Sequence, residues 1–213
     1  RELQPLLEHV RTAIALRQMG MFPWAEAEYR HVIGQMAGNH PLAANARFSL
    51  AEMLHDQQRD DAAAKVLEEA LAAAGGKKPQ AALADRSTAE IASRMHFFFA
   101  CDAERQGRRE LQKDHLLQGL AVDEPDIDLL IMANRFDGFT AEQRNSVAAK
   151  IKQMSDELLQ DIANEPENPI YLNQYAWLAG NTSGDRAVLN AALKHSTRSL
   201  ELSPNNAGYL DTL

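Results

Sequence analysis

Residues 44–75 read ANARFSLAEMLHDQQRDDAAAKVLEEALAAAG, a pattern typical of two short amphipathic helices joined by a polar turn. The turn, DQQRDD, covers residues 56–61. Apolar residues recur every three or four positions in each half, as expected for helices that bury one face. The stripes consist of Leu50, Ala51 and Leu54 in the first half, one turn after Arg47, and of Ala63, Leu67 and Ala70 in the second. The small alanine side chains allow the two helices to approach closely.

The predicted hairpin resembles the tetratricopeptide repeat. The signature of that family places Trp, Leu, Gly and Tyr on a first helix, Ala and a large apolar residue on a second, and Pro at the end. Most of these positions are occupied here by Leu50, Ala51, Leu54, Ala63 and Leu67. Arg47 stands in place of the Trp, and Gly75 in place of the Pro. Arg47 is therefore expected either to be paired across the interface between repeats or to be displaced toward solvent.

Similar patterns recur along the chain with insertions between the copies. Ala25 and Tyr29 repeat the second-helix spacing near the N-terminus, and Tyr175 and Ala176 repeat the first-helix spacing near the C-terminus. Residues 127–165 have the order of a helical pair without the signature, and we interpret them as a divergent repeat. The predicted units are 6–41, 44–77, 93–126, 127–165, 169–206 and a truncated start at 207–213, which together form one domain over residues 1–213.

Local signals predict where several helices begin and end. Gly20 suits the turn after the first helix, and Pro23 suits the first turn of the next one. Ser87 and Thr140 each stand three residues before a Glu or Gln, which is the order of a capping box. Residues 75–79, GGKKP, are predicted to be a loop from their composition.

The resemblance implies an all-α fold, a right-handed α-solenoid of helix-turn-helix repeats in which the first helix of each repeat lines a concave groove. It also implies that residues between the packing positions face this groove and bind a peptide or a partner helix. These candidates are Asn45, Phe48, Glu52 and His55 in the second unit, Arg94, Phe97, Cys101 and Arg105 in the third, and Asn173 and Trp177 in the last. The alternative for the three aromatic residues is that their rings pack against the next repeat.

Composition and charge narrow the possible partners. Hydrophobic residues make up 45% of the 213 residues and charged residues 24%, which is ordinary for a globular chain. The net charge of -8 argues against a nucleic-acid surface, which needs a basic patch. No apolar run approaches the roughly 20 residues of a membrane span. The single cysteine excludes an internal disulfide, which favours a cytoplasmic over an oxidising location without establishing it.

Catalytic and metal-binding interpretations find little support in the residue pattern. The GxSxG, HExxH, P-loop and GxGxxG motifs are absent, and the histidines are dispersed along the chain. His96 and Cys101 lie five positions apart, which is an awkward spacing for two metal ligands on one helix face. Cys101 is interpreted instead as a small buried hydrophobic residue. We therefore predict no enzyme, no cofactor and no metal site.

The remaining chemistry is recognition, and three classes of function stay open. We expect a non-enzymatic protein-interaction scaffold that binds a peptide or partner helix in the groove. The alternative is a regulatory or positioning domain of a larger enzyme, because the chain opens at Arg1 without Met and stops within a predicted helix start. The third class is small-molecule binding, which predicts a deep apolar pocket beside Phe97 and Trp177.

One specific partner class can be weighed from the residues themselves. Co-chaperones of the family hold an acidic peptide terminus with Lys and Asn side chains in the groove. The corresponding positions here include Glu52 and Asp56, which would repel a carboxylate. Capture of an acidic peptide terminus is therefore not expected, while the partner's identity, the pathway and the oligomeric state stay open.

Overall fold

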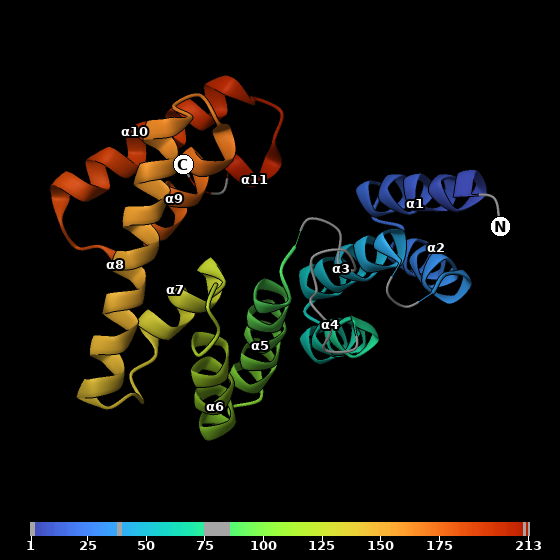
Figure 1. The fold of residues 1–213 in the computed structure, drawn as a ribbon, viewed down its shortest axis with the longest axis horizontal. Helices are drawn as coiled ribbons and strands as arrows, with labels where there is room; N and C mark the ends of the chain where they lie inside the picture. The colour runs from blue at the N-terminus through green and yellow to red at the C-terminus, as the bar shows by residue number, and fades with distance from the viewer. Residues whose placement is uncertain (1–2, 38–39, 75–85, 211, 213) are drawn as a thin grey trace. The chain divides into compact units, whose positions relative to one another are not determined.

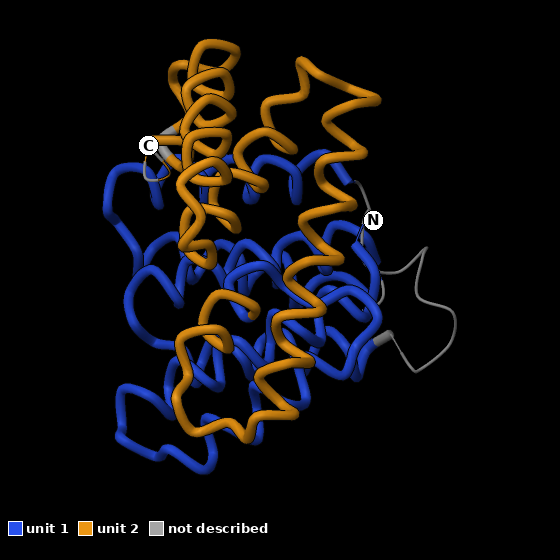
Figure 2. The backbone as a smooth tube through the Cα atoms, turned by 90° about the vertical axis from the view of Figure 1, so that its left-hand side faces the viewer, with its two compact units in different colours: residues 1–129 blue, residues 130–213 orange. Residues whose placement is uncertain are grey.

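The structure, a computed structural model, describes residues 3–37, 40–74, 86–210 and 212. These residues form eleven α-helices and no strand, which confirms the all-α prediction (Figure 1). The chain divides into two compact units, residues 1–129 and residues 130–213 (Figure 2).

Unit 1 is built from three pairs of helices. The helices are α1 (Leu3–Gln18), α2 (Phe22–Gln35), α3 (Pro41–Asp56), α4 (Asp60–Ala74), α5 (Thr88–Arg105) and α6 (Arg109–Leu120), followed by the start of α7 (Ile127–Arg135). From α1 to α6, each helix packs against its neighbours in the sequence. This consecutive packing is what a series of helical hairpins requires, since every helix then buries a face against its sequence neighbours.

Unit 2 contains the rest of α7 and four further helices. These are α8 (Ala141–Asn164), α9 (Pro169–Thr182), α10 (Arg186–Leu202) and the single turn α11 (Ala207–Leu210). Helix α9 packs against both α8 and α10, and α11 touches α10. The helical pair predicted for residues 169–206 is therefore present as α9 and α10.

Most of the predicted helix ends are present, because they depend on local chemistry. Gly20 has a φ of 73° after α1, in the left-handed region that favours glycine. Pro23 lies in the first turn of α2, and the Ser87 hydroxyl accepts a hydrogen bond from the Glu90 amide at 3.0 Å. Thr140 and its partner Gln143 form the complete capping box at the start of α8. The predicted loop at residues 75–79 lies outside the described residues.

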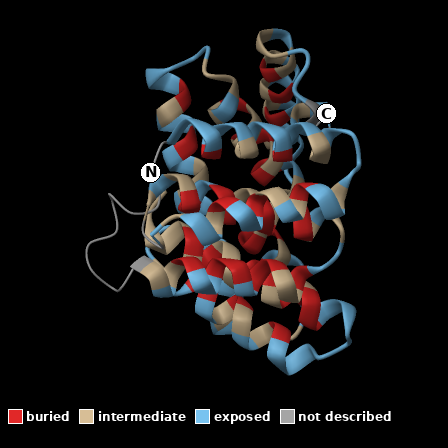
Figure 3. Cartoon of the chain, turned by 90° about the vertical axis from the view of Figure 1, so that its right-hand side faces the viewer, coloured by how far each residue is buried: buried red, intermediate tan, exposed pale blue. Residues whose placement is uncertain are grey.

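The predicted packing positions form the core between α3 and α4. Leu50, Ala51, Leu54, Ala63 and Leu67 are all fully buried. Figure 3 shows the same arrangement along the helices, with buried residues on the faces that meet and exposed residues on the opposite faces. Burying each leucine stabilises the fold by about 1.5–3 kcal/mol, so this pair is held mainly by apolar contact.

Arg47 is buried within unit 1 instead of being displaced toward solvent. Only 8% of its surface is exposed. Burial lowers the pKa of Arg47, and the negative charge of Glu69 on α4 acts in the opposite direction. Arg47 therefore belongs to the interior of unit 1, where the aliphatic part of an arginine side chain can pack against apolar neighbours.

Candidate functional site

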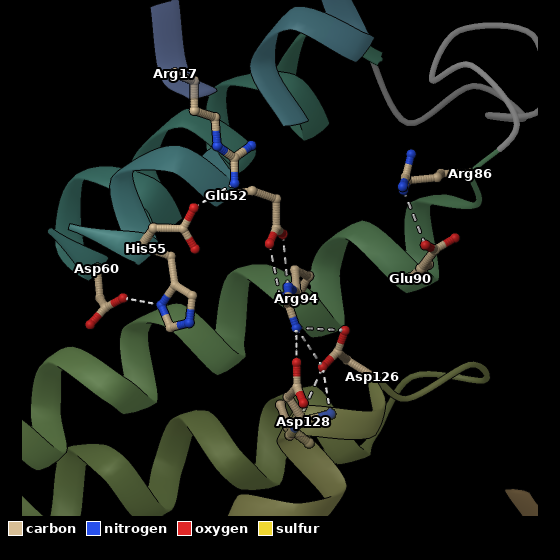
Figure 4. Close-up of polar contacts among 11 residues, drawn as sticks. Arg17, Glu52, His55, Asp60, Arg86, Glu90, Arg94, Asp126 and Asp128 are labelled. Atoms are coloured by element: carbon tan, nitrogen blue, oxygen red, sulfur yellow. Dashed lines mark hydrogen bonds and ion pairs between the residues drawn. The ribbon is translucent and has the colours of Figure 1, made fainter. Parts of the chain in front are cut away.

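An arginine with little exposed surface connects three helices at the predicted groove face of unit 1. Arg94 Nε and Nη2 on α5 donate hydrogen bonds to the two carboxylate oxygens of Glu52 on α3, at 3.0 and 2.9 Å. Its Nη1 contacts Asp126 at 3.1 Å and Asp128, in the first turn of α7, at 2.6 Å. Figure 4 shows the guanidinium surrounded by these three carboxylates. We call Glu52, Arg94, Asp126 and Asp128 the Arg94 cluster.

The Arg94 cluster contains more negative than positive charge. Three carboxylates face one guanidinium, so two negative charges are left over when all are ionised. Burial alone would lower the pKa of Arg94, but Asp126, Glu52 and Asp128 outweigh it and raise that pKa well above its ordinary value. Burial raises the pKa of Asp126, against the opposing effect of Arg94. The side chains of Asp128 and Glu52 keep 32% and 22% of their surface exposed, so part of this charge reaches solvent.

Local structure explains why Asp126 lies where it does. Its carboxylate caps the start of α7 by accepting hydrogen bonds from the backbone amides of Asp128 and Leu129, at 2.9 and 3.2 Å. Its own amide donates to the Ser93 hydroxyl at 2.8 Å, and that hydroxyl donates to the Gly119 carbonyl at 3.2 Å. The buried Ser93 thus joins α5, the end of α6 and the start of α7, and holds the acidic groups against Arg94.

Two aromatic rings lie beside the Arg94 guanidinium. The centres of the Phe97 and Phe98 rings are each 5.0 Å from the guanidinium carbon, within the range of a cation–π contact. His55 stacks on Phe98 and meets Phe97 edge to face. Phe97 is 7% exposed, so its ring belongs to the packing of unit 1, as in the alternative considered from the sequence.

The remaining candidates on α3 and α5 form a second group around Asp60. His55 Nδ1 contacts the carboxylate of Asp60, which begins α4, and Arg105 forms an ion pair with the same carboxylate. Arg105 also donates to the Gln58 carbonyl at 2.5 Å. Cys101 lies close to His55 and Asp60. Burial and the charge of Glu104 raise the pKa of Cys101 to about 12, so its thiol is not a nucleophile at neutral pH.

Asn45 and Phe48 lie toward the other end of α3. The Asn45 side chain is exposed, and the Phe48 ring is half-buried. The Arg86 guanidinium lies 3.7 Å from the centre of that ring and also pairs with Glu90 at 3.2 Å. Of the aromatic candidates in unit 1, Phe48 is therefore the one with a ring accessible at the surface.

The two candidates in unit 2 are separate from this group. Asn173 and Trp177 lie on α9, and Trp177 lines a pocket of about 330 Å³ between α9 and α10. Leu189 and Leu193 of α10 line the same pocket, with Leu193 52% exposed. Asn181, also in its wall, accepts a hydrogen bond from Arg135. The small-molecule hypothesis predicted a deep apolar pocket beside Phe97 and Trp177, and of these two residues Trp177 lines this pocket.

Several residues of the site were missed in the sequence. Asp126 is the last residue of the predicted unit 93–126 and Asp128 belongs to the next unit, so neither lies at the first-helix positions from which the groove residues were selected. The available signal was an Asp immediately before a predicted helix, a cap position from which a carboxylate can face a neighbouring helix.

His96 and Cys101, which the sequence analysis considered as a possible pair of metal ligands, have different neighbours. His96 Nδ1 lies 3.2 Å from His115 Nδ1, whereas Cys101 lies near His55 and Asp60.

No helix of the described residues is long and apolar enough to cross a membrane. The comparisons with known proteins were also negative: no family model, no curated protein and no solved structure matches the chain.

Proposed function

We propose that this chain is a non-enzymatic scaffold of the tetratricopeptide-repeat type that binds a basic segment of a partner protein on the face formed by α3 and α5. The observation that supports this proposal best is the excess of carboxylates in the Arg94 cluster. Two of its acids, Glu52 and Asp128, keep part of their surface exposed. The consecutive packing of helix pairs in unit 1 supports the repeat architecture.

Electrostatics favours a Lys or Arg side chain as the group that the face recognises. Glu52 and Asp128 are already oriented by Arg94, so an incoming cation does not have to order them. A carboxylate arriving at the same place would meet like charge, and the whole chain carries a net charge of -8. Asn45, exposed on α3, offers an amide that can hydrogen-bond to the backbone of an extended segment.

Fluorescence anisotropy with pairs of labelled peptides tests this proposal. The peptides of each pair have the same length and apolar residues, with Lys and Arg in one replaced by Glu and Asp in the other. We expect the basic member to bind more tightly, and its binding to weaken as salt is added, because screening reduces attraction between exposed charges.

A matched pair of variants locates the binding. Asp128→Asn removes one negative charge from the Arg94 cluster. It should weaken binding of the basic peptide about fivefold, which corresponds to a loss of roughly 1 kcal/mol in binding free energy. Asp156→Asn is the control, because Asp156 is an exposed acid of α8 that pairs with Lys152. Equal binding of acidic and basic peptides, or equal losses in the two variants, would rule out recognition by the Arg94 cluster.

A further inference from the structure

A second cluster in unit 1 combines three different types of metal-binding side chain. His55 at the end of α3, Asp60 at the start of α4 and Cys101 on α5 each offer one donor atom, and these atoms lie within 4.8 Å of one another. The Asp60 side chain has no exposed surface, and that of His55 has 29%. Three helices thus bring nitrogen, oxygen and sulfur donors to one place at their junction.

This donor set suits a borderline-soft divalent ion. Zinc binds imidazole, carboxylate and thiolate at about 2.0–2.3 Å in a tetrahedral arrangement, which places neighbouring donors roughly 3.5 Å apart. Donor atoms that lie within 4.8 Å of one another have to approach by up to about 1.3 Å, which is a side-chain adjustment. Calcium and magnesium, which prefer oxygen ligands alone, fit this set poorly.

We propose that His55, Asp60 and Cys101 form a binding site for a zinc-class divalent ion at the junction of α3, α4 and α5. On binding, the thiol proton of Cys101 passes to solvent and the thiolate takes its place on the metal. Arg105 is the competitor, since it forms an ion pair with Asp60. Its side chain is 40% exposed, so it can turn toward solvent when the metal takes the carboxylate. The site is independent of the recognition proposed for the Arg94 cluster.

Cobalt(II) added to the purified metal-free chain tests the site directly. A cobalt–thiolate bond produces a charge-transfer absorption in the near ultraviolet, which a purely structural cysteine cannot produce. We expect this absorption to saturate at one equivalent and to disappear when zinc is added. We also expect zinc alone to raise the Tm of the wild-type chain, because it binds the folded state.

Four variants make the test specific. Cys101→Ser should abolish the charge-transfer absorption, and His55→Gln should weaken zinc binding more than tenfold, since loss of even an outer partner of a metal ligand costs 10- to 100-fold. Arg105→Gln should strengthen binding by removing the competitor. His96→Gln is the control on α5 and should leave the absorption unchanged.

Circular dichroism of each variant verifies that it is folded before the metal is added. An absent absorption and an unchanged Tm in the wild-type chain would overturn the proposal. The same absorption in Cys101→Ser would overturn it as well.

Discussion

At the scale of single residues, Arg94 is a charged side chain of unit 1 whose burial has to be compensated by hydrogen bonds and ion pairs. Its side chain is 13% exposed and has carboxylate partners on α3, in the first turn of α7 and immediately before α7. Taking a guanidinium out of water is costly unless its donors are satisfied, and here they are satisfied by Glu52, Asp126 and Asp128. The cluster therefore both connects α3, α5 and α7 and presents acidic groups at the surface.

Replacing Arg94 should lower the free energy of unfolding much more than replacing a surface arginine. Arg94→Gln leaves three carboxylates close together without a counter-charge, and we expect a loss of about 3 kcal/mol in the free energy of unfolding at neutral pH. Arg11→Gln, at an exposed pair with Glu8, should cost under about 0.5 kcal/mol. Urea unfolding monitored by circular dichroism measures both. Similar losses in the two variants would show that the cluster does not stabilise the fold.

The paired histidines of α5 and α6 should make unit 1 sensitive to acid. Burial and the neighbouring His115 lower the pKa of His96 from 6.5 to about 4. In the unfolded chain this imidazole takes up a proton below about pH 6.5, whereas in the folded chain it does so only near pH 4. Stability is therefore fully present above pH 6.5 and is lost as the pH falls from 6.5 toward 4.

The variant His96→Gln should flatten this part of the stability–pH curve, because it removes the titrating group. His31→Gln, at an exposed position of α2, serves as the control and should keep the wild-type slope. Urea unfolding at several pH values between 4 and 7 measures the slopes. The same slope in wild type and His96→Gln would exclude His96 as a source of acid sensitivity.

At the scale of helices, the contact between the end of α6 and the start of α7 depends on the absence of a side chain at Gly119. A Cβ atom added at Gly119 would overlap the Leu129 side chain and approach the His96 Cβ to 3.1 Å. Leu129 is fully buried, so its side chain would have to shift within the core of unit 1. The Gly119 carbonyl meanwhile accepts the hydrogen bond from Ser93 that helps to position Asp126.

Two glycine-to-alanine substitutions should consequently have opposite effects. Gly119→Ala introduces overlap in a packed interface and should destabilise the chain by about 1–3 kcal/mol. In Gly34→Ala the added methyl group meets nothing within 4 Å. It should stabilise α2 by about 0.5–1 kcal/mol, because alanine restricts the unfolded backbone. Thermal unfolding compares the two, and a stabilised Gly119→Ala chain would contradict the close approach.

Helices were predictable to the extent that their signals are local. Pro23, Ser87 and the Thr140–Gln143 box mark helix starts through their own backbone chemistry, so the sequence contained enough information to place them. The stripe through Leu50 and Leu54 likewise identifies a buried face without any knowledge of its neighbour. The partners of a polar side chain depend on three-dimensional packing, so local sequence signals do not predict them.

At the scale of the whole molecule, the chain consists of two compact helical units. The sequence correctly predicted an all-helical protein and placed Glu52, His55, Arg94 and Phe97 at related positions of α3 and α5. It did not predict that Arg94 contacts Glu52, Asp126 and Asp128, because those contacts join segments that are distant in sequence. Nor did it predict the contact between His55 and Asp60, which the turn between α3 and α4 brings together. The face that we propose for recognition is smaller and more acidic than the predicted row of groove residues.

The proposed recognition face can be located by hydrogen–deuterium exchange of the full chain with and without a saturating basic peptide. Binding on α3 and α5 should slow exchange in residues 45–56 and 94–105, and Asp128→Asn should reduce this protection at the same peptide concentration. Residues 186–202 of α10 should exchange at unchanged rates. Protection restricted to residues 186–202, or protection at α3 and α5 that Asp128→Asn leaves intact, would contradict recognition through the Arg94 cluster.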